Sequence, residues 1–403
     1  MKIIHTADWH IGKILHKQEL HEEISLFLDW LITYIHDHAI DVLLVSGDIF
    51  DLANPSHKDT KLYYDTLTKL INAGTKVIIT GGNHDSIHLI NAPSRLLKPL
   101  NIDVIGGVPD EAGQQIIPVY DVRGAISCIV LAVPFLRDKD LRKSQSADIA
   151  TDKSLTTQSA IKSHYDELVM TAIKEYGTDL PIVAMGHLYM RGALTSDSER
   201  EIHVGTLQGI ASEVIGDAIS YMALGHIHKP QIIDKKNHIR YSGSPVYLDF
   251  SESAYEKMII VLDVMPNKSI DVEPIKLPKF RELLRLKGPL TDIVSTLNTY
   301  KNPYPLITCI ELEVIEPYFD LSLMHEFQLL ADQSTTEYKV IKSKISFGDA
   351  TTNLQDYVQL DKGIDEMSPL QILDNRLQNE QLDDDKITEI RQAYLDIVQE
   401  LTN

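Results

Sequence analysis

Short apolar runs alternate with longer amphipathic segments along the first half of the chain. The runs KIIHT, VLLVS and KVIIT have the length and composition of buried strands. Between them, apolar residues recur at spacings of three and four, which is typical of the buried face of a helix. The pattern predicts helices at residues 19–39 and 62–74, and further strands at 127–133, 181–186 and 221–225. This alternation predicts a layered α/β domain whose helices cover a central sheet.

The second half of the chain follows a different pattern. The apolar segments at 238–243 and 257–264 have little helix between them, so we expect a mixed rather than a purely parallel sheet. Beyond a composition change near Pro278, the segments up to residue 347 spell β-α-β-α-β. A polar linker and terminal helices follow, and one of these helices carries an apolar stripe formed by Ile387, Ile390, Tyr394, Ile397 and Leu401. We therefore expect three regions, 1–277, 278–347 and 348–403.

The composition is that of a globular protein with room for two or three domains, because 43% of the 403 residues are hydrophobic. Polar residues interrupt the first apolar run almost at once, so we expect no signal peptide, and no apolar run is long enough to cross a bilayer. Cys128 and Cys309 lie far apart in strand-like segments. We expect two buried thiols in a reduced cytoplasmic protein rather than a disulfide.

The chain is strongly acidic, with a net charge of -20 from 38 basic and 58 acidic residues. This charge argues against broad nonspecific binding to nucleic acid, whose phosphates favour basic surfaces. Bound divalent cations would offset part of it locally, so the charge does not exclude a DNA substrate.

Polar residues with metal-binding side chains follow five predicted strands. In open α/β sheets, ligand sites gather beyond the carboxyl ends of strands, so these five loops are expected to meet in one crevice. The candidates are Asp8 and His10, then Asp48 and Asp51 in GDIFD, then Asn83, His84 and Asp85 in GGNHD, then His187 in GHLYM, and finally His226 and His228 in GHIHKP.

Each motif also has a plainer explanation when it is taken alone. A D-x-H sequence is usually a loop or a helix cap, GDIFD could cap the next helix, and His187 alone would be a core or surface histidine. GGNHD after a buried strand and the H-x-H pair are more specific, since alternate residues can point the same way. All five motifs in this order favour a metal site.

The residue types indicate which ions the site would bind and what it would do. Carboxylates, an amide oxygen and imidazoles without a thiolate suit Mn²⁺, Fe²⁺ or Zn²⁺. Seven ligands drawn from these ten candidates would be too many for one ion, but they would suit two ions with one bridging carboxylate. Two ions roughly 3.5–4 Å apart can activate a nucleophile and neutralise a phosphoryl group. Phosphoester hydrolysis is therefore the expected chemistry.

The ordered motifs D-x-H, GD-x-x-D, GNHD, GH and GH-x-H resemble those of the calcineurin-like metallophosphoesterases. The longer segments HTADWHIGK, VSGDIFDLANPS and ALGHIHKPQ are similar to those of the family's DNA-repair nucleases. The resemblance implies a metallophosphoesterase sandwich with mixed central sheets, a small α+β cap domain and C-terminal helices. It implies two metal ions, with Mn²⁺ the best candidate, and one metal set of Asp8, His10 and His228, a second of Asn83, His187 and His226, and Asp48 as the bridge.

The resemblance also implies roles for the residues beside these ligands. His84 would face the scissile phosphate as the catalytic residue, and Asp85 would orient a neighbour. Asp51 stays outside the catalytic set, as a residue that orients a neighbour or caps a helix. Histidines elsewhere near the motifs, such as His5, are expected to have core or surface roles.

The resemblance finally implies a DNA exonuclease and endonuclease that works with a coiled-coil ATPase. Region 278–347 would help position DNA, the C-terminal helices would bind the ATPase, and the chain would form a homodimer within a heterotetramer. A basic cluster could contact phosphates or form a solvated strand face; it comprises Lys276, Lys279, Arg281, Arg285 and Lys287. The alternatives are a small-molecule phosphodiesterase or phosphatase on the same scaffold and a non-enzymatic DNA-end tether.

Overall fold

The computed structural model describes residues 1–143, 153–199, 209–265, 267, 269–318, 320–348, 373, 377 and 386–394. The chain divides into two compact units. The first comprises Met1–Arg285, Tyr300–Glu311 and Ala331–Lys342. The second comprises Leu286–Thr299, Leu312–Leu330 and the described residues from Ser343 onward.

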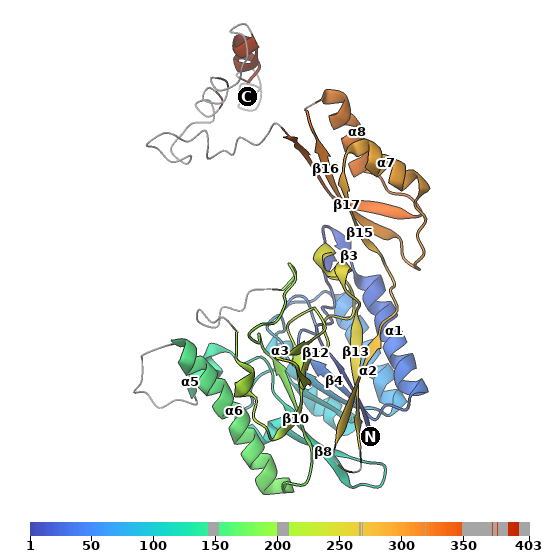
Figure 1. The fold of residues 1–403 in the computed structure, drawn as a ribbon. Helices are drawn as coiled ribbons and strands as arrows, with labels where there is room; N and C mark the ends of the chain where they lie inside the picture. Colours follow the sequence, from blue (N-terminus) through green and yellow to red (C-terminus); the bar gives the residue numbers. More distant parts are fainter. Residues whose placement is uncertain are drawn as a thin grey trace. The chain divides into compact units, whose positions relative to one another are not determined.

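The first unit contains two six-stranded sheets (Figure 1). In the first sheet the order is β14 (Ile270–Lys276), β13 (Met258–Val264), β1 (Lys2–Thr6), β4 (Val42–Ser46), β5 (Lys76–Thr80) and β6 (Ile102–Ile105). Strands β1, β4, β5 and β6 pair in parallel, whereas β13 is antiparallel to both of its neighbours. The sheet is mixed, as predicted from the segments at 238–243 and 257–264.

The second sheet is also mixed. Its order is β11 (Gln231–Ile233), β12 (Lys236–Tyr241), β10 (Ile219–Gly225), β9 (Ile182–His187), β8 (Ile126–Ala132) and β7 (Ile116–Tyr120). The four strands β12, β10, β9 and β8 are parallel, and an antiparallel strand closes each edge. Because buried strands have the same apolar composition in either sheet, the pattern of hydrophobic residues could not assign them to two sheets.

Helices cover the outer faces of both sheets, so the first unit has four layers (Figure 1). Apolar side chains such as Ile3, Leu44, Val130 and Met185 fill the space between the sheets. Helices α1 (His21–Asp37) and α2 (His57–Ala73) share a second core with the first sheet. Helix α6 (Lys153–Tyr176) shares a third core with the second sheet. The predicted layered α/β class is confirmed.

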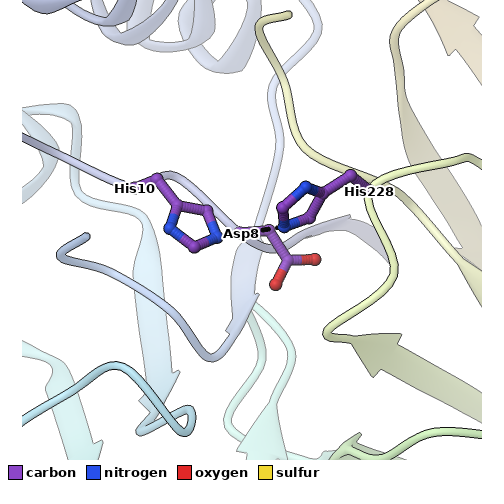
Figure 2. Close-up of side chains that lie close together, drawn as sticks. All are labelled: Asp8, His10 and His228. Carbon is purple, nitrogen blue, oxygen red and sulfur yellow. Dashed lines mark hydrogen bonds between the residues drawn. The ribbon is translucent and has the colours of Figure 1, made fainter. Parts of the chain in front are cut away.

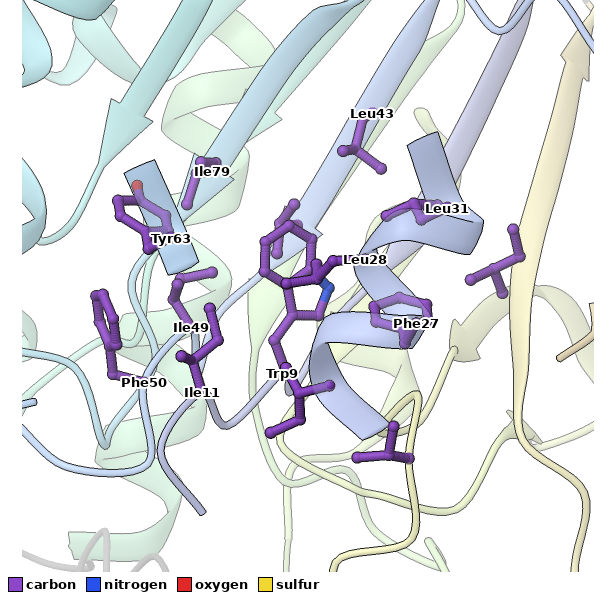
Figure 3. Packing of buried hydrophobic residues seen from close by; sticks show 14 of the residues in the cluster. Trp9, Ile11, Phe27, Leu28, Leu31, Leu43, Ile49, Phe50, Tyr63 and Ile79 are labelled. Carbon is purple, nitrogen blue, oxygen red and sulfur yellow. The ribbon is translucent and has the colours of Figure 1, made fainter. Parts of the chain in front are cut away.

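The two helices on the first sheet follow from simple sequence features. Apolar residues of α1 at spacings of three and four, including Phe27, Leu28 and Leu31, pack with Trp9 in one core (Figure 3). Helix α2 begins with a capping box in which Ser56 and Asp59 satisfy each other's backbone N–H groups. It ends at Gly74, whose φ of 76° suits a residue without a side chain.

Residues 283–347 contain the predicted β-α-β-α-β order. The elements are β15 (Leu283–Gly288), α7 (Leu290–Thr299), β16 (Thr308–Glu316), α8 (Leu321–Ala331) and β17 (Tyr338–Phe347), and the three strands form their own sheet. Residues 386–394 are helical, as predicted. The predicted linker and the stripe residues Ile397 and Leu401 lie outside the described residues.

Short elements complete the described part of the fold. They are β2 (Ile14–Leu15), β3 (Gln18–Glu19), α3 (Ile87–Asn91), α4 (Ser94–Leu97), α5 (Asp138–Lys143), η1 (Lys98–Leu100), η2 (Ala112–Gln115), η3 (Ser212–Val214) and η4 (Phe250–Ala254). Cys128 and Cys309 are buried and free, so the prediction of two unpaired thiols is confirmed. Among the residues described, every helix is too short or too polar to cross a membrane.

Candidate metal centre

The five predicted loops meet at one edge of the first unit. They follow β1, β4 and β5 in one sheet and β9 and β10 in the other. The loops bring buried carboxylate and imidazole groups together in three overlapping triplets, each with its ligand atoms within 4.8 Å of one another. The triplets are Asp8, His10 and His228; His10, Asp48 and His84; and Asp48, His187 and His226.

The first triplet places two imidazole nitrogens face to face. The Nε2 atoms of His10 and His228 lie 3.1 Å apart, close to the Asp8 carboxylate (Figure 2). The Asp8 carboxylate itself accepts hydrogen bonds from the backbone N–H of His226, at 2.9 and 3.1 Å. A loop of the second sheet is thereby fixed to the first loop of the chain.

Hydrogen bonds behind the two rings indicate where their protons are. The Nδ1 atom of His10 lies 3.2 Å from a carboxylate oxygen of Asp51. The Nδ1 atom of His228 lies 3.1 Å from a carboxylate oxygen of Glu252. Since an ionised carboxylate only accepts, each Nδ1 carries the proton and each Nε2 presents a lone pair. Two such lone pairs lie 3.1 Å apart only when a shared proton or a metal ion sits between them.

The third triplet is built on Asp48 and His187. The Nδ1 atom of His187 donates to the backbone carbonyl of Ser46 at 3.0 Å, so Nε2 is the ring nitrogen that faces the centre. That Nε2 lies 3.3 Å from Asp48 Oδ2 and 2.9 Å from Asn83 Oδ1. Asn83 therefore joins this triplet, as predicted. Asp48 Oδ2 is also 3.7 Å from His10 Nε2, so Asp48 lies between the first and third triplets.

His84 lies at the edge of the same centre. Its backbone N–H donates to Asp48 Oδ1 at 2.9 Å, and its ring Nδ1 donates to the backbone carbonyl of Asp51 at 2.7 Å. The other ring nitrogen, Nε2, is 4.0 Å from Asp48 Oδ2. The ring is also edge-on to that of His10, with centroids 4.7 Å apart. The side chain is thus held with Nε2 facing the centre.

Several of these residues have a backbone conformation that is unfavourable for residues with side chains. Asp8, His10, Asp48 and His226 have φ values of 54°, 45°, 50° and 99°. Such strain persists only where the surroundings enforce it, and it gathers at functional sites. Here backbone hydrogen bonds enforce it, for example from Asp8 N–H to the Gly47 carbonyl at 3.0 Å.

Two glycines are required by close approach rather than by turn geometry. A Cβ on Gly82 would lie 2.1 Å from Asp48 Oδ1, and a Cβ on Gly225 would lie 1.8 Å from the Ser46 carbonyl oxygen. The loops can approach this closely only because these positions have no side chain. The glycines that precede the predicted ligands therefore help to bring the five loops together.

The electrostatics of the centre fit divalent cations. Burial raises the pKa of Asp8 to about 7, and repulsion from Asp48 adds to this effect. Burial alone would raise the pKa of Asp48 as well, but the neighbouring His187 holds it well below its usual value. Burial keeps the pKa of His226 well below 6.5, so its ring stays neutral, the form that binds metals. A bound cation would relieve the cost of burying both carboxylates.

The carboxylates beside the ligands have orienting roles. Asp51 accepts from the His10 ring and lies 3.3 Å from the Lys13 ammonium. It does not cap α2, since that helix is capped by Ser56. Asp85 accepts from the backbone N–H groups of Ile49, Phe50 and Gly82, at 2.8–3.1 Å. Asp85 therefore holds the second and third loops together, in agreement with its predicted role as an orienting residue.

Two parts of the centre lie outside the five sequence motifs. One is the loop after β8, where the Phe135 ring is edge-on to His187 and the Arg137 guanidinium donates to the Asp85 carbonyl at 3.3 Å. The other is the buried pair Glu252 and Lys257 behind His228. The segment YSGSPVYLDF just before Glu252 contains no metal-binding motif that could have pointed to this pair.

The structure also gives the surroundings of His5 and of the basic cluster. His5 is a core histidine, fully buried, with Nδ1 3.1 Å from the Tyr221 hydroxyl and Nε2 3.1 Å from the Leu224 carbonyl oxygen. Every member of the basic cluster is ion-paired with a glutamate. The pairs are Lys276–Glu256, Lys279–Glu282, Arg281–Glu23, Arg285–Glu311 and Lys287–Glu313.

Comparison with known proteins agrees with this geometry. A family model described as calcineurin-like phosphoesterase matches residues 1–230. The chain therefore belongs to the calcineurin-like phosphoesterase family, and its fold is that of the family.

Two relatives show to which branch of the family the chain belongs. The SbcD subunit of the nuclease SbcCD from Escherichia coli (strain K12) is 30% identical over 398 residues, covering 98% of this chain and 97% of the relative. The SbcD subunit from Rhodobacter capsulatus is 35% identical over 316 residues, covering 75% and 76%. These matches place the chain in the SbcD branch of the family. Among solved structures, a dimetal phosphatase from Danio rerio aligns with 9% identity and a TM-score of 0.42, covering 69% of this chain and 97% of that one.

Proposed function

We propose that this chain is a metal-dependent DNA nuclease that hydrolyses phosphodiester bonds with two divalent ions. The observation that carries the proposal is the buried donor cluster in which Asp48 lies between the first and third triplets, in a chain similar over nearly its whole length to a named nuclease subunit. The activities expected are double-strand exonuclease and single-strand or hairpin endonuclease, in DNA repair and recombination.

The donor geometry supports one assignment of ligands. Asp8, His10 and His228 would hold one ion, because their free donor atoms converge. Asn83, His187 and His226 would hold the other, and Asp48 would bridge the two. The mixture of carboxylate, amide and imidazole donors suits Mn²⁺, which we propose as the metal.

The reaction divides between the ions and the protein. When bound, the two ions supply a water-derived nucleophile and neutralise charge on the phosphoryl group. His84 would supply the proton. Its Nδ1–H is already donated to the Asp51 carbonyl, so a protonated His84 can give up only its Nε2 proton, which faces the centre. Transfer of that proton to the leaving oxygen, or a hydrogen bond to the phosphate, would stabilise the charge that develops.

The remaining regions would supply the substrate and the partner contacts. Residues 1–277 would form the nuclease domain, and residues 278–347 would form a cap that helps to position DNA. Residues 348–403 would bind an SbcC-type coiled-coil ATPase, and two copies of the chain would pair within a heterotetramer in the cytoplasm. The ion pairing of the basic cluster supports a complex in which the partner and the metals supply much of the DNA affinity. The isolated chain is therefore expected to bind DNA weakly.

A comparison of substrates tests the proposal. The chain, its partner ATPase, ATP and Mn²⁺ are incubated with a linear duplex, with a DNA hairpin and with bis-p-nitrophenyl phosphate. Cleavage of both DNAs that stops when the metal is chelated is the expected result. Hydrolysis of the small ester with both DNAs intact would instead identify a small-molecule phosphodiesterase.

A further inference from the structure

Two buried charged residues behind His228 belong to none of the five motifs. Glu252 lies on the short 3-10 helix η4, and Lys257 directly precedes β13. Their side chains are 0% and 3% exposed, and their ion pair measures 2.5 Å. Removing two charges from water is costly, and such a pair adds little net stability compared with apolar residues. A role other than stability is therefore worth seeking.

Both members of the pair contact the same residue of the metal centre. Glu252 Oε1 accepts the proton of His228 Nδ1 at 3.1 Å, and Lys257 Nζ donates to the His228 backbone carbonyl at 3.3 Å. The hydroxyl of Ser198 adds a contact of 2.6 Å to the same Nδ1. The ion pair thus contacts both the ring and the backbone of His228.

The Glu252 carboxylate is itself fixed by further contacts. Its Oε2 accepts from Lys257 and from the backbone N–H of Leu248, the latter at 3.1 Å. Lys257 also donates to the Ser244 hydroxyl at 2.6 Å. With these contacts, Glu252 cannot turn away from His228 without losing several buried hydrogen bonds.

The first and third triplets are supported differently. His228 depends on a side-chain carboxylate, whereas His187 is held by the backbone carbonyl of Ser46. A substitution at Glu252 therefore alters the support of one triplet and leaves the corresponding support of the other in place.

We propose that Glu252 and Lys257 form a positioning unit for the ion held by Asp8, His10 and His228. The unit fixes the Nδ1–H form of His228, so that its Nε2 lone pair is directed at that ion. Loss of the unit weakens binding of this ion and spares the one held by Asn83, His187 and His226. This inference rests on the proposed two-metal centre.

Titration of the full-length, metal-free chain with Mn²⁺ tests the inference without any activity assay. Calorimetry gives the number and affinity of bound ions, and electron paramagnetic resonance distinguishes an isolated Mn²⁺ from a coupled pair. The natural chain is expected to bind two ions and to show the coupled signal. In Glu252→Gln, one of the two affinities falls about 10- to 100-fold, and the spectrum at moderate Mn²⁺ is that of an isolated ion.

Further variants separate positioning from simple destabilisation. Glu252→Asp keeps the charge beside Lys257 but is one methylene shorter, so it should fold and lose the same ion even if Glu252→Gln does not fold. Glu23→Gln is the matched control, because Glu23 forms a buried ion pair with Arg281 that contacts none of the metal donors. It should lower the free energy of unfolding and still bind two coupled ions.

The outcomes that overturn the inference are distinct from those that overturn the proposed function. Folded Glu252 variants that bind both ions as tightly as the natural chain, or that lose both ions equally, refute the positioning role. A natural chain that binds no Mn²⁺ refutes the two-metal centre and the inference together.

Discussion

His10 and His228 present their Nε2 atoms to each other at 3.1 Å, although 218 positions separate them in the chain. A carboxylate behind each ring holds the proton on the opposite nitrogen, with Asp51 behind His10 and Glu252 behind His228. Such an arrangement needs a shared proton or a metal ion between the two nitrogens. The fold therefore holds both nitrogens where a single cation can bind them.

The role of His84 can be separated from metal binding. His84→Gln should lower kcat for DNA cleavage about 10²- to 10⁴-fold, because it removes the group that protonates the leaving oxygen. Metal content measured by mass spectrometry should stay at two ions, since the proposed ligands are unchanged. Unaltered cleavage would refute the catalytic role, and loss of an ion would make His84 a ligand.

A single methyl group added at Gly82 should have a large effect on metal binding, because the Gly82 backbone lies very close to Asp48. Gly82→Ala places a Cβ where Asp48 Oδ1 lies, so Asp48 must move. Because Asp48 is the proposed bridge between the two ions, calorimetry should find weaker binding of both. Gly113→Ala is the control, as a Cβ there meets nothing within 4 Å and both affinities should be unchanged. Equal metal binding by the two variants would contradict the proposed position of Asp48.

The burial of His5 predicts that the free energy of unfolding depends on pH. Burial lowers its pKa to about 3, whereas in the unfolded chain it titrates near its ordinary value of 6.5. Between these values the unfolded chain binds a proton that the folded chain does not, so stability falls as the pH drops through this window. Between pH 7 and pH 5 the loss from this residue is up to about 2 kcal/mol.

His5→Gln should remove this contribution. Urea unfolding of the metal-free protein at both pH values measures it, and the variant should lose less stability than the natural chain on going from pH 7 to pH 5. An identical loss in the two proteins would show that His5 is accessible to protons in the folded state.

A substitution in the buried Arg281–Glu23 pair tests whether the basic cluster contacts phosphates or has a structural role. Arg281 is 4% exposed, and its guanidinium lies 2.7 Å from the Glu23 carboxylate. Arg281→Met should therefore lower the free energy of unfolding by about 3–5 kcal/mol, because it leaves Glu23 buried and unpaired. DNA affinity of the folded variant should be unchanged. Weaker DNA binding at unchanged stability would instead make Arg281 a phosphate contact.

Much of the fold was predictable because buried parallel strands are continuous apolar runs. The runs KIIHT, VLLVS and KVIIT coincide with β1, β4 and β5. Helix α2 begins at His57, five residues before its predicted start at 62, because its first turn is polar and is stabilised by the Ser56 capping box rather than by apolar contacts. The pairing of strands into two sheets depends on contacts between distant segments, which no local pattern records.

The centre was predictable to the extent that its ligands lie directly after strands. All seven predicted donors were brought together by the fold. Glu252 and Lys257 were missed because charged residues are mostly exposed, and only the three-dimensional structure shows this pair to be buried. Arg137 was missed because the loop after β8 contains no metal-binding motif.

Anomalous X-ray diffraction at the manganese absorption edge, from crystals of the chain grown with Mn²⁺, tests the central claim most directly. The account predicts two peaks, one among Asp8, His10 and His228 and one among Asn83, His187 and His226, with the Asp48 carboxylate between them. A single peak, or peaks away from these side chains, would contradict it.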